Sequence, residues 1–232
     1  MYNRILIKLS GEILLRDNTS GETPLDRFVN EVKELQDLSV EVAIVIGAGN
    51  VIRGLHAEEQ GIDRYTADYI GMIATLINAL FLKDILTKNG VKASVMSSLE
   101  VKDVCPSFSK EGALRVMGGG KILILAGGTG NPYFTTDTAA ALRAIEINAE
   151  ILLKATKVDG VYTSDPVTDP EAKKFNQLTY EEVIKRNLKV MDLTAISLCR
   201  ENHLPIVVCN MDKPGNIKKI LKGERVGTLI KG

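Results

Sequence analysis

The sequence contains no tryptophan, and aromatic side chains make up only 5% of its 232 residues. Proteins that bind single-stranded nucleic acid commonly stack bases on aromatic side chains, so this scarcity argues against that class. The chain also lacks an excess of either charge, because 29 lysine and arginine residues balance 29 aspartate and glutamate residues. No overall field therefore favours nucleic acid or an anionic membrane, and a partner must be recognised at a local site.

Cysteine is scarce as well. Cys105, Cys199 and Cys209 share no CxxC spacing and are odd in number, which predicts reduced thiols in a core rather than disulfides or a zinc site. His56 and His203 lie far apart in the sequence, and neither forms a metal-ligand motif with a cysteine, so structural or surface roles are expected for both. The amino-terminal segment MYNRILIKLSGE carries lysine inside its apolar stretch and predicts neither a signal peptide nor a membrane span. We expect a cytoplasmic protein.

Both standard nucleotide-binding fingerprints are missing. The chain has no GxxxxGK[ST] segment, and no strict GxGxxG follows a strand-like run. Any nucleotide site must therefore be built from other glycine-rich turns.

Strand-like and helix-like segments alternate along the chain. Short apolar runs predict strands at 4–9, 42–46, 93–96, 122–126, 151–153, 205–209 and 227–230. Apolar residues at helical spacing predict helices at 25–38, 66–89, 110–117, after 135 or 136, and at 179–185, 192–200 and 216–222. The segment 166–179 is expected to be a surface excursion. This order predicts an α/β fold over 1–232 as a single domain, a three-layer α/β/α sandwich with a mainly parallel central sheet.

The central feature is the stretch from Gly127 to Asp165. It joins two predicted strands through a glycine-rich loop and a helix that Thr135 or Thr136 can cap, with Asp137 in the first turn. Glycines let the backbone approach a ligand closely, and a helix start attracts anions. The segment is equally compatible with an ordinary strand, turn and helix whose charges are solvated.

Two further positions carry charge near glycine turns. Lys8 lies in a strand of branched apolar residues, so its ammonium either extends to solvent or meets an anion. The turn 47–50 follows the next strand, and Arg53 comes shortly after it. In the long helix 66–89, Asp68 is expected in the first turn, where the helix dipole stabilises a carboxylate.

Six segments together resemble the bacterial-type UMP kinases of the amino-acid-kinase family. They are KLSGE, VIGAGNVIRG, ADYIGMIATLINAL, GTGNPYFTTDTAA, LLKATKVDGVYTSDP and VMDLTA, in the family's order and along essentially the whole chain. The resemblance implies transfer of the γ-phosphoryl group of ATP to UMP in pyrimidine nucleotide biosynthesis. It also implies Mg²⁺, a homohexamer and inhibition by UTP, without a nucleic acid or membrane partner.

The resemblance also implies roles for individual residues. It places the reaction centre at Lys8, Arg53, Asp137 and Asp192. It places ATP at Lys8, Leu9, Ser10, Gly11, Gly49, Arg53, Thr156, Tyr162 and Asp165. It places UMP at Ala48, Asp68, Thr129, Gly130, Asn131, Pro132, Tyr133, Phe134, Thr135 and Thr136. The UMP side thus lies mainly in the first two thirds of the chain and the ATP side mainly in the last third. Magnesium would be held mainly by ATP phosphates and water, shared with Asp137 or Asp192.

The chain departs from the family pattern in two places. Ala48 stands where members usually have a glycine, which requires that the backbone there does not adopt a positive φ. The segment 14–24 lacks the GEGFG-like run associated with GTP activation, so that property is not carried over.

Two other functions are compatible with the fold. One is a kinase of the same fold that acts on a carboxylate, such as acetylglutamate or aspartate, although Asp68 would repel such a substrate. The other is a regulatory protein that senses pyrimidine nucleotides without catalysis. The presence of Lys8, Arg53, Asp137 and Asp192 together favours an enzyme.

Overall fold

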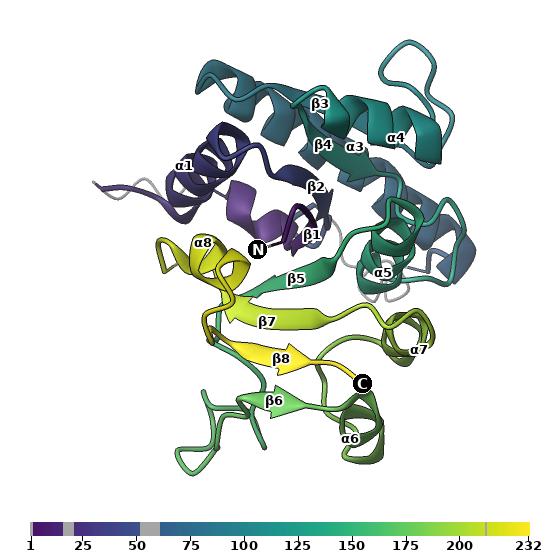
Figure 1. Ribbon diagram of the computed structural model, residues 1–232. Helices are drawn as coiled ribbons and strands as arrows, with labels where there is room; N and C mark the ends of the chain where they lie inside the picture. The colour runs from purple at the N-terminus through teal and green to yellow at the C-terminus, as the bar shows by residue number, and fades with distance from the viewer. Residues whose placement is uncertain (1, 16–20, 52–60, 212) are drawn as a thin grey trace.

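The computed structural model describes residues 2–15, 21–51, 61–211 and 213–232. Its strands are β1 (Arg4–Leu9), β2 (Glu41–Ile46), β3 (Ala93–Ser97), β4 (Ile122–Ala126), β5 (Ile151–Thr156), β6 (Gln177–Leu178), β7 (Ile206–Asn210) and β8 (Thr228–Ile230). In this part of the chain they form one eight-stranded sheet in the order β3-β4-β2-β1-β5-β7-β8-β6 (Figure 1). Only the pairing of β7 with β8 is antiparallel among the described strands, so the predicted mainly parallel sheet is confirmed.

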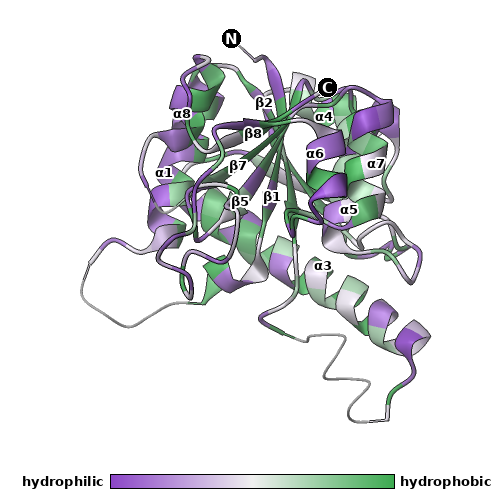
Figure 2. Ribbon diagram, turned by 90° about the horizontal axis from the view of Figure 1, so that it is seen from below, coloured by the Kyte–Doolittle hydropathy of each residue, from purple (hydrophilic) through white to green (hydrophobic). Residues whose placement is uncertain are grey.

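Helices cover both faces of the sheet. They are α1 (Pro24–Asp37), α3 (Arg64–Lys88), α4 (Lys110–Gly118), α5 (Thr136–Glu146), α6 (Tyr180–Lys185), α7 (Leu193–Glu201) and α8 (Asn216–Leu221), with a short 3₁₀ helix η1 (Gly11–Leu14) after β1. Buried residues of α1, α3 and α8 pack on one face, and those of α4, α5, α6 and α7 pack on the other. Figure 2 shows the apolar strands between α1 and α8 on one side and α5, α6 and α7 on the other. The three-layer α/β/α prediction is confirmed.

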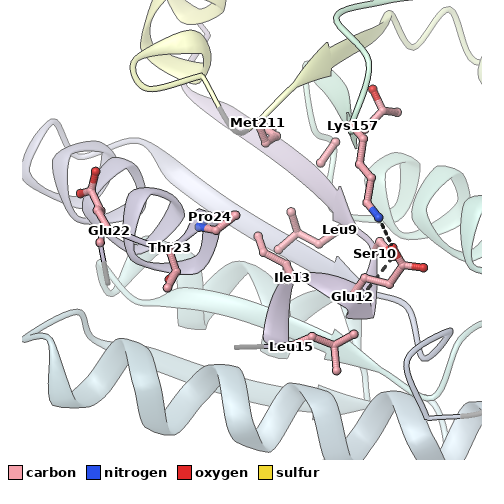
Figure 3. Close-up of a pocket in the computed structure, with 13 residues that line it drawn as sticks. Leu9, Ser10, Glu12, Ile13, Leu15, Glu22, Thr23, Pro24, Lys157 and Met211 are labelled. Atoms are coloured by element: carbon pink, nitrogen blue, oxygen red, sulfur yellow. Dashed lines mark hydrogen bonds and ion pairs between the residues drawn. The ribbon is translucent and has the colours of Figure 1, made fainter. Parts of the chain in front are cut away.

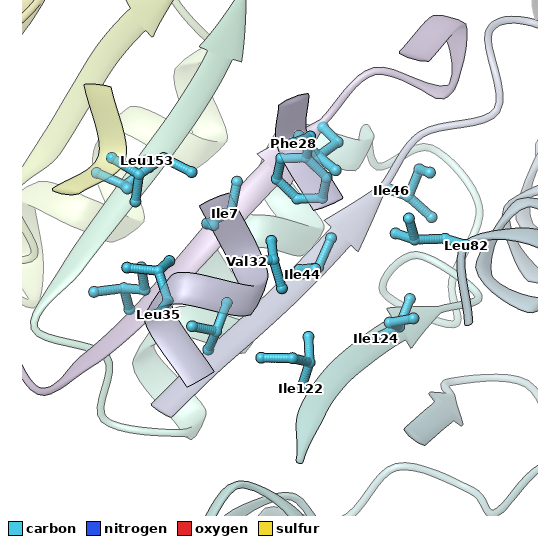
Figure 4. Packing of buried hydrophobic residues seen from close by; sticks show 14 of the residues in the cluster. Ile7, Phe28, Val32, Leu35, Ile44, Ile46, Leu82, Ile122, Ile124 and Leu153 are labelled. Atoms are coloured by element: carbon cyan, nitrogen blue, oxygen red, sulfur yellow. The ribbon is translucent and has the colours of Figure 1, made fainter. Parts of the chain in front are cut away.

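The alternation of side chains along β1 explains where its lysine points. Ile5, Ile7 and Leu9 belong to the core under α1 and α3, whereas Leu6 belongs to the core under α5. Because successive strand residues face opposite sides, Lys8 shares the α5 side with Leu6. Figure 4 shows the first of these cores, in which Ile7 lies near Phe28 of α1. Burying such a side chain contributes about 1.5 to 3 kcal/mol, which fixes the facing of the strand.

Helix α3 is long and apolar on more than one side. By length and composition it is the one helix of the described residues that could cross a membrane. A core helix of a globular protein passes the same test, and α3 buries Leu76, Ala79, Leu82 and Leu86 in the core beside β3 and β4. We therefore interpret α3 as a core helix.

Several details differ from the expectations. β5 continues through Thr156, so Lys154 lies within the strand, and the segment expected to be a surface excursion contributes β6. The three cysteines are buried and free, as predicted. Burial raises the pKa of the Cys199 and Cys209 thiols to about 12.

The predicted position of Asp68 in the first turn of its helix is wrong. Asp63 caps α3 by accepting a hydrogen bond from the Thr66 amide, and the helix begins at Arg64. Asp68 is therefore in the second turn, where the helix dipole has little effect.

Candidate active site

The site forms where the carboxyl ends of β4, β2, β1 and β5 meet the start of α5. These four strands are neighbours in the sheet and run parallel, so the turns after them gather at one edge. Ligands of open α/β sheets bind at such edges. The predicted site residues on the turns after β1, β2 and β4 therefore converge.

A compact charge cluster occupies this edge. Lys8 and Lys154 lie opposite each other in the register of β1 and β5. The Asp137 carboxylate lies between them, with Oδ1 3.0 Å from the Lys8 ammonium and Oδ2 2.6 Å from the Lys154 ammonium. The three side chains are only 16%, 15% and 15% exposed, in the order Lys8, Lys154 and Asp137. Weak screening at such depth makes each interaction stronger than a surface ion pair.

The environment shifts the pKa values within this cluster. Burial alone would raise the pKa of Asp137, but the charges of Lys8 and Lys154 outweigh it and hold the pKa below its usual range. Burial lowers the pKa of Lys154, although the Asp137 carboxylate acts in the opposite direction. Asp137 is thus an ionised carboxylate that depends on both lysines.

Lys8 is less fully paired than Lys154. Its ammonium lies 3.0 Å from Asp137 Oδ1 and has no other acceptor among the described residues. Lys154 donates to Asp137 Oδ2 and also to the Val190 carbonyl. An ammonium has three donors, so Lys8 retains capacity for an anionic ligand.

Helix α5 starts beside this cluster because of a well-formed cap. The Thr135 hydroxyl accepts hydrogen bonds from the Asp137 and Thr138 amides at 3.1 and 3.2 Å, which selects Thr135 over Thr136 as the cap. The helix start directs its remaining N–H groups and its positive dipole end toward the same edge.

Asp192 joins α5 to α7. It caps α7, which was predicted at 192–200, by accepting a hydrogen bond from the Ala195 amide at 3.0 Å. Its carboxylate also accepts hydrogen bonds from the Thr135 and Thr138 hydroxyls. Asp192 therefore makes its hydrogen bonds with the two helix starts, and none with Lys8 among the described residues.

The turn after β2 packs tightly against η1 and α3. The buried Asn78 side chain donates to the Gly47 carbonyl and to Asn50 Oδ1, both at 2.8 Å. A Cβ on Gly11 would lie 2.2 Å from Asn50 Oδ1 and 2.4 Å from the Gly47 carbonyl, so only glycine fits there. Ala48 is buried and does not have a positive φ, so its methyl group is compatible with this turn.

The β4–α5 loop (residues 127–135) is held by distant elements. Gly127 has φ 77° and donates its amide to the Thr75 hydroxyl of α3 at 2.8 Å. The Ser98 hydroxyl donates to the Gly128 carbonyl at 2.8 Å. Tyr133 adopts a positive φ, and its amide donates to Asp68 Oδ2 at 2.7 Å. The Asp68 carboxylate is also paired with Arg64 at 2.9 Å, so it links the start of α3 to this loop.

The expected UMP residues occupy this loop and its surroundings. Thr129, Gly130, Asn131, Pro132, Tyr133, Phe134, Thr135 and Thr136 run from β4 to the first turn of α5. The structure brings Asp68 to the loop and places Ala48 on the neighbouring turn. Tyr133 and Phe134 have exposed aromatic rings.

The expected ATP residues are more dispersed. Leu9, Ser10 and Thr156 line a cavity of about 460 Å³ between η1, the start of α1 and the end of β5 (Figure 3). A Lys157–Glu12 ion pair of 2.8 Å lies beside it. Tyr162 and Asp165 belong to the β5–β6 connection (residues 157–176) and do not line this cavity. Arg53 and His56 lie outside the described residues.

The described residues are compatible with a hydrated magnesium ion that is held mainly by phosphates, and they do not form a metal site of three or more protein ligands. They contain no group of three or more histidine, cysteine or acidic side chains arranged to hold a metal. Asp137 Oδ1 is a buried carboxylate oxygen whose one partner among the described residues is the Lys8 ammonium, and the Asp192 carboxylate lies nearby at the start of α7. Magnesium bound to phosphates needs only one or two carboxylates and keeps several waters.

Reasoning from the sequence missed three polar residues that support the site. The polar side chains of Thr75 and Asn78 within the apolar α3 were not singled out, whereas Lys154 was expected directly after the strand 151–153, at the edge where ligands bind. Ser98 gave no local signal because its partners are remote in sequence.

Comparison with known proteins agrees with this geometry. The model of the amino acid kinase family matches residues 3–210. A uridylate kinase from Bacteroides thetaiotaomicron is 49% identical over 231 residues, which cover 99% of this chain and 98% of that protein. The UMP kinase structure from Bacillus anthracis is 43% identical, with a TM-score of 0.93 and coverage of 99% and 96% of the two chains. The UMP kinase structure from Ureaplasma parvum is 35% identical, with a TM-score of 0.90 and full coverage of both chains at 100%. The chain belongs to the amino acid kinase family, within its uridylate kinase group.

Proposed function

We propose that this chain transfers the γ-phosphoryl group of ATP to UMP, giving UDP and ADP. The observation that carries the proposal is the Lys8, Asp137 and Lys154 cluster at the shared edge of β1 and β5. Similarity to uridylate kinases over nearly the whole chain supports UMP as the acceptor. The enzyme is a nucleoside monophosphate kinase.

The reaction needs charge stabilisation more than proton transfer. An oxygen of the UMP phosphate attacks the γ-phosphorus of ATP and forms a new P–O bond. The bond from the γ-phosphorus to the β–γ bridging oxygen breaks, and ADP leaves with that electron pair. Because the attacking phosphate is already an anion, no general base is required. The protein therefore acts by aligning the two phosphates and neutralising charge.

Lys8 is proposed to contact the transferred phosphoryl group. Its ammonium lies at the strand edge with donor capacity left after pairing with Asp137. Arg53 is proposed as the second cation, and Asp137 and Asp192 as the carboxylates that orient the centre. The starts of α5 and α7 add N–H groups and positive dipole ends beside them.

The acceptor is proposed to bind along the β4–α5 loop. Residues 129–136 and Ala48 surround the nucleotide, and Asp68 accepts hydrogen bonds from its sugar hydroxyls. The contacts of Thr75, Ser98 and Asp68 support this assignment because they fix the loop in one conformation.

The donor is proposed to bind on the β5 side. Ser10, Gly11, Gly49 and Thr156 approach the ATP phosphates and sugar, and Leu9, Tyr162 and Asp165 complete the site. The 460 Å³ cavity beside Ser10 and Thr156 supports this placement, since ligand pockets commonly measure about 300 to 1,000 Å³.

Mg²⁺ is proposed to accompany ATP, and Asp137 and Asp192 would hold it through water. When bound, it supplies positive charge to the phosphate oxygens. The two neighbouring carboxylates, Asp137 on the first turn of α5 and Asp192 at the start of α7, support this role.

Assembly, regulation and location are also proposals. The chain is expected to act as a single domain and to form a homohexamer in the cytoplasm, to be inhibited by UTP in pyrimidine biosynthesis and to require no nucleic acid or membrane. Exposed apolar residues along α3 support the assembly, namely Tyr65, Ile73, Ile77, Leu80 and Phe81. Exposed apolar residues gathered along one helix are typical of an interface between subunits. Light scattering that shows only a 25.3 kDa monomer at micromolar concentration would contradict it.

A coupled ADP-release assay tests the function. It compares UMP, CMP, AMP, acetylglutamate and aspartate as acceptors at saturating ATP and magnesium. We expect UMP to be used far more efficiently than the others. Turnover of acetylglutamate or aspartate would instead identify a carboxylate kinase. Nucleotide binding without turnover of any acceptor would identify a sensing protein.

A further inference from the structure

Lys154 occupies an unusual position beside Lys8. The two lysines lie in register on neighbouring parallel strands, which are separated by about 4.8 Å. Both side chains turn to the α5 side of the sheet, as shown by their contacts with the same carboxylate. Two adjacent buried ammonium groups repel each other, so their coexistence depends on Asp137.

The partners of Lys154 are all within the protein. Its ammonium donates to Asp137 Oδ2 at 2.6 Å and to the Val190 carbonyl. Lys8, in contrast, pairs only with Asp137 Oδ1 among the described residues. Lys8 therefore has N–H donors available for a ligand, whereas the Lys154 ammonium is used to hold Asp137 and the Val190 carbonyl.

The contacts of Lys154 complete a closed series of hydrogen bonds and chain connections that joins the start of α5 to the start of α7. Val190 precedes Asp192 by two residues, and Asp192 accepts from the Thr135 and Thr138 hydroxyls of α5. Asp137 lies between those threonines in the chain. The series therefore runs from Asp137 through Lys154 to Val190 and Asp192, and returns to α5 through the threonines. Lys154 is the member that ties it to the sheet.

We propose that Lys154 is a positioning residue for phosphoryl transfer, which fixes the Asp137 carboxylate and the starts of α5 and α7 so that Lys8 is presented to the transferred group. This inference rests on the proposed function. Without Lys154, Asp137 can rotate toward Lys8 or toward solvent, and the Val190 carbonyl loses its donor. Misplacement of a reacting group by about 1 Å can reduce a rate by about a hundredfold.

The test compares steady-state kinetics of Lys154→Met, Asp137→Asn and the double variant with wild type. We expect Lys154→Met to lower kcat by about ten- to a hundredfold and to change both KM values by less than about threefold. Because Lys154 acts through Asp137, the double variant should have a kcat within about threefold of Asp137→Asn alone. A merely structural lysine would lower the melting temperature and leave kcat of the folded protein unchanged.

Two further variants serve as a conservative replacement of Lys154 and as a control. Lys154→Gln keeps hydrogen-bond donors without charge and should fall between wild type and Lys154→Met; it replaces Lys154→Met if that protein does not fold. Lys218→Met removes an exposed ion pair with Glu34, 2.9 Å long and remote from the site, and should keep wild-type kinetics. An unchanged kcat in both Lys154 variants overturns the proposal. So do multiplying losses in the double variant or a dominant rise in KM, which would mean direct contact with a nucleotide. Wild-type protein without UMP turnover would instead refute the proposed function itself.

Discussion

The β4–α5 loop and the β5–β6 connection adjoin the same site but are stabilised in different ways. The β4–α5 loop depends on remote partners, with Thr75 and Asp68 on α3 and Ser98 after β3. Arg143 adds a contact from α5, with its guanidinium 2.9 Å from the Ser98 hydroxyl and 3.4 Å from the Thr129 carbonyl.

The β5–β6 connection mostly bonds to itself. Asp165 accepts from the Val167 amide and Asp169 from the Glu171 amide, both at 2.9 Å, while Ser164 donates to Asp169. Thr228 of β8 ties the two ends of the connection through Val161 and Phe175. The comparison indicates that the geometry of the first loop is coupled to the core, whereas the second can change locally.

The largest effect on kcat is expected from a substitution of Lys8, which belongs to neither of these two loops. Lys8→Met should lower kcat by about a hundredfold or more, since a lost preorganised donor costs about 3 kcal/mol in the transition state. The hydrogen bonds of both loops should survive, so circular dichroism should show a folded protein. Near wild-type turnover in the purified variant would refute the role of Lys8.

Gly127→Ala should distort the backbone of the β4–α5 loop. Gly127 has φ 77°, and an added Cβ would lie 2.9 Å from both Ser97 Oγ and the Ser98 amide. We expect the free energy of unfolding to fall by about 1 to 3 kcal/mol and KM for UMP to rise, with KM for ATP little changed.

Gly90→Ala is the matched control for this substitution. Gly90 has a similar φ of 82°, but nothing lies within 4 Å of its absent Cβ. The added methyl group should only strain the backbone, which lowers the free energy of unfolding by about 1 kcal/mol. Both KM values should stay unchanged. Equal effects of the two substitutions on UMP binding would contradict the coupling of loop geometry to the site.

Asp68→Ala should change the choice between ribose and deoxyribose. A hydrogen bond to a charged group contributes about 1.5 to 3 kcal/mol, so wild type should prefer UMP to dUMP by about ten- to a hundredfold in kcat/KM. The variant should compress this ratio toward one.

The structure supplies the competing outcome, because Asp68 also accepts from the Tyr133 amide and pairs with Arg64. If it only holds the loop, Asp68→Ala will raise KM for UMP and dUMP equally and leave their ratio unchanged. Asp68→Asn, which keeps an acceptor oxygen for Tyr133, should then restore most of the binding.

The sequence was sufficient to predict the elements whose signal is local. β1, β2 and β4 are buried on both faces and appear as mainly apolar runs, and Thr135, one of the two expected candidates, caps α5. The start of α3 was misplaced because both Asp63 and Thr66 are good capping residues, and the earlier one caps the helix.

The contacts that assemble the site were beyond such reasoning. The predicted strand 151–153 stopped before Lys154 because a lysine seldom continues a buried run, and only the β1–β5 register places Lys154 beside Lys8. The partnership of Ser98 with Gly128 joins residues 30 positions apart, which no periodicity reports. The roles assigned to individual site residues stay predictions.

The smallest expected effects come from removing one serine hydroxyl in, or beside, each of the two loops. Ser164→Ala removes an exposed hydroxyl whose partner Asp169 can bind water instead, so the free energy of unfolding should fall by at most about 0.5 kcal/mol. Ser98→Ala removes a hydroxyl that donates to Gly128 and accepts from the buried Arg143, 6% exposed. Leaving such groups without a partner costs about 1 to 3 kcal/mol.

Chemical denaturation of both variants, with KM for each nucleotide, measures this difference. We expect Ser98→Ala to raise KM for UMP by severalfold and Ser164→Ala to leave it unchanged, because of these two serines only Ser98 holds the loop that is proposed to bind the acceptor. Equal losses of stability in the two variants would show that the β5–β6 connection is coupled to the core as strongly as the β4–α5 loop. The contrast between remote and local stabilisation would then be wrong.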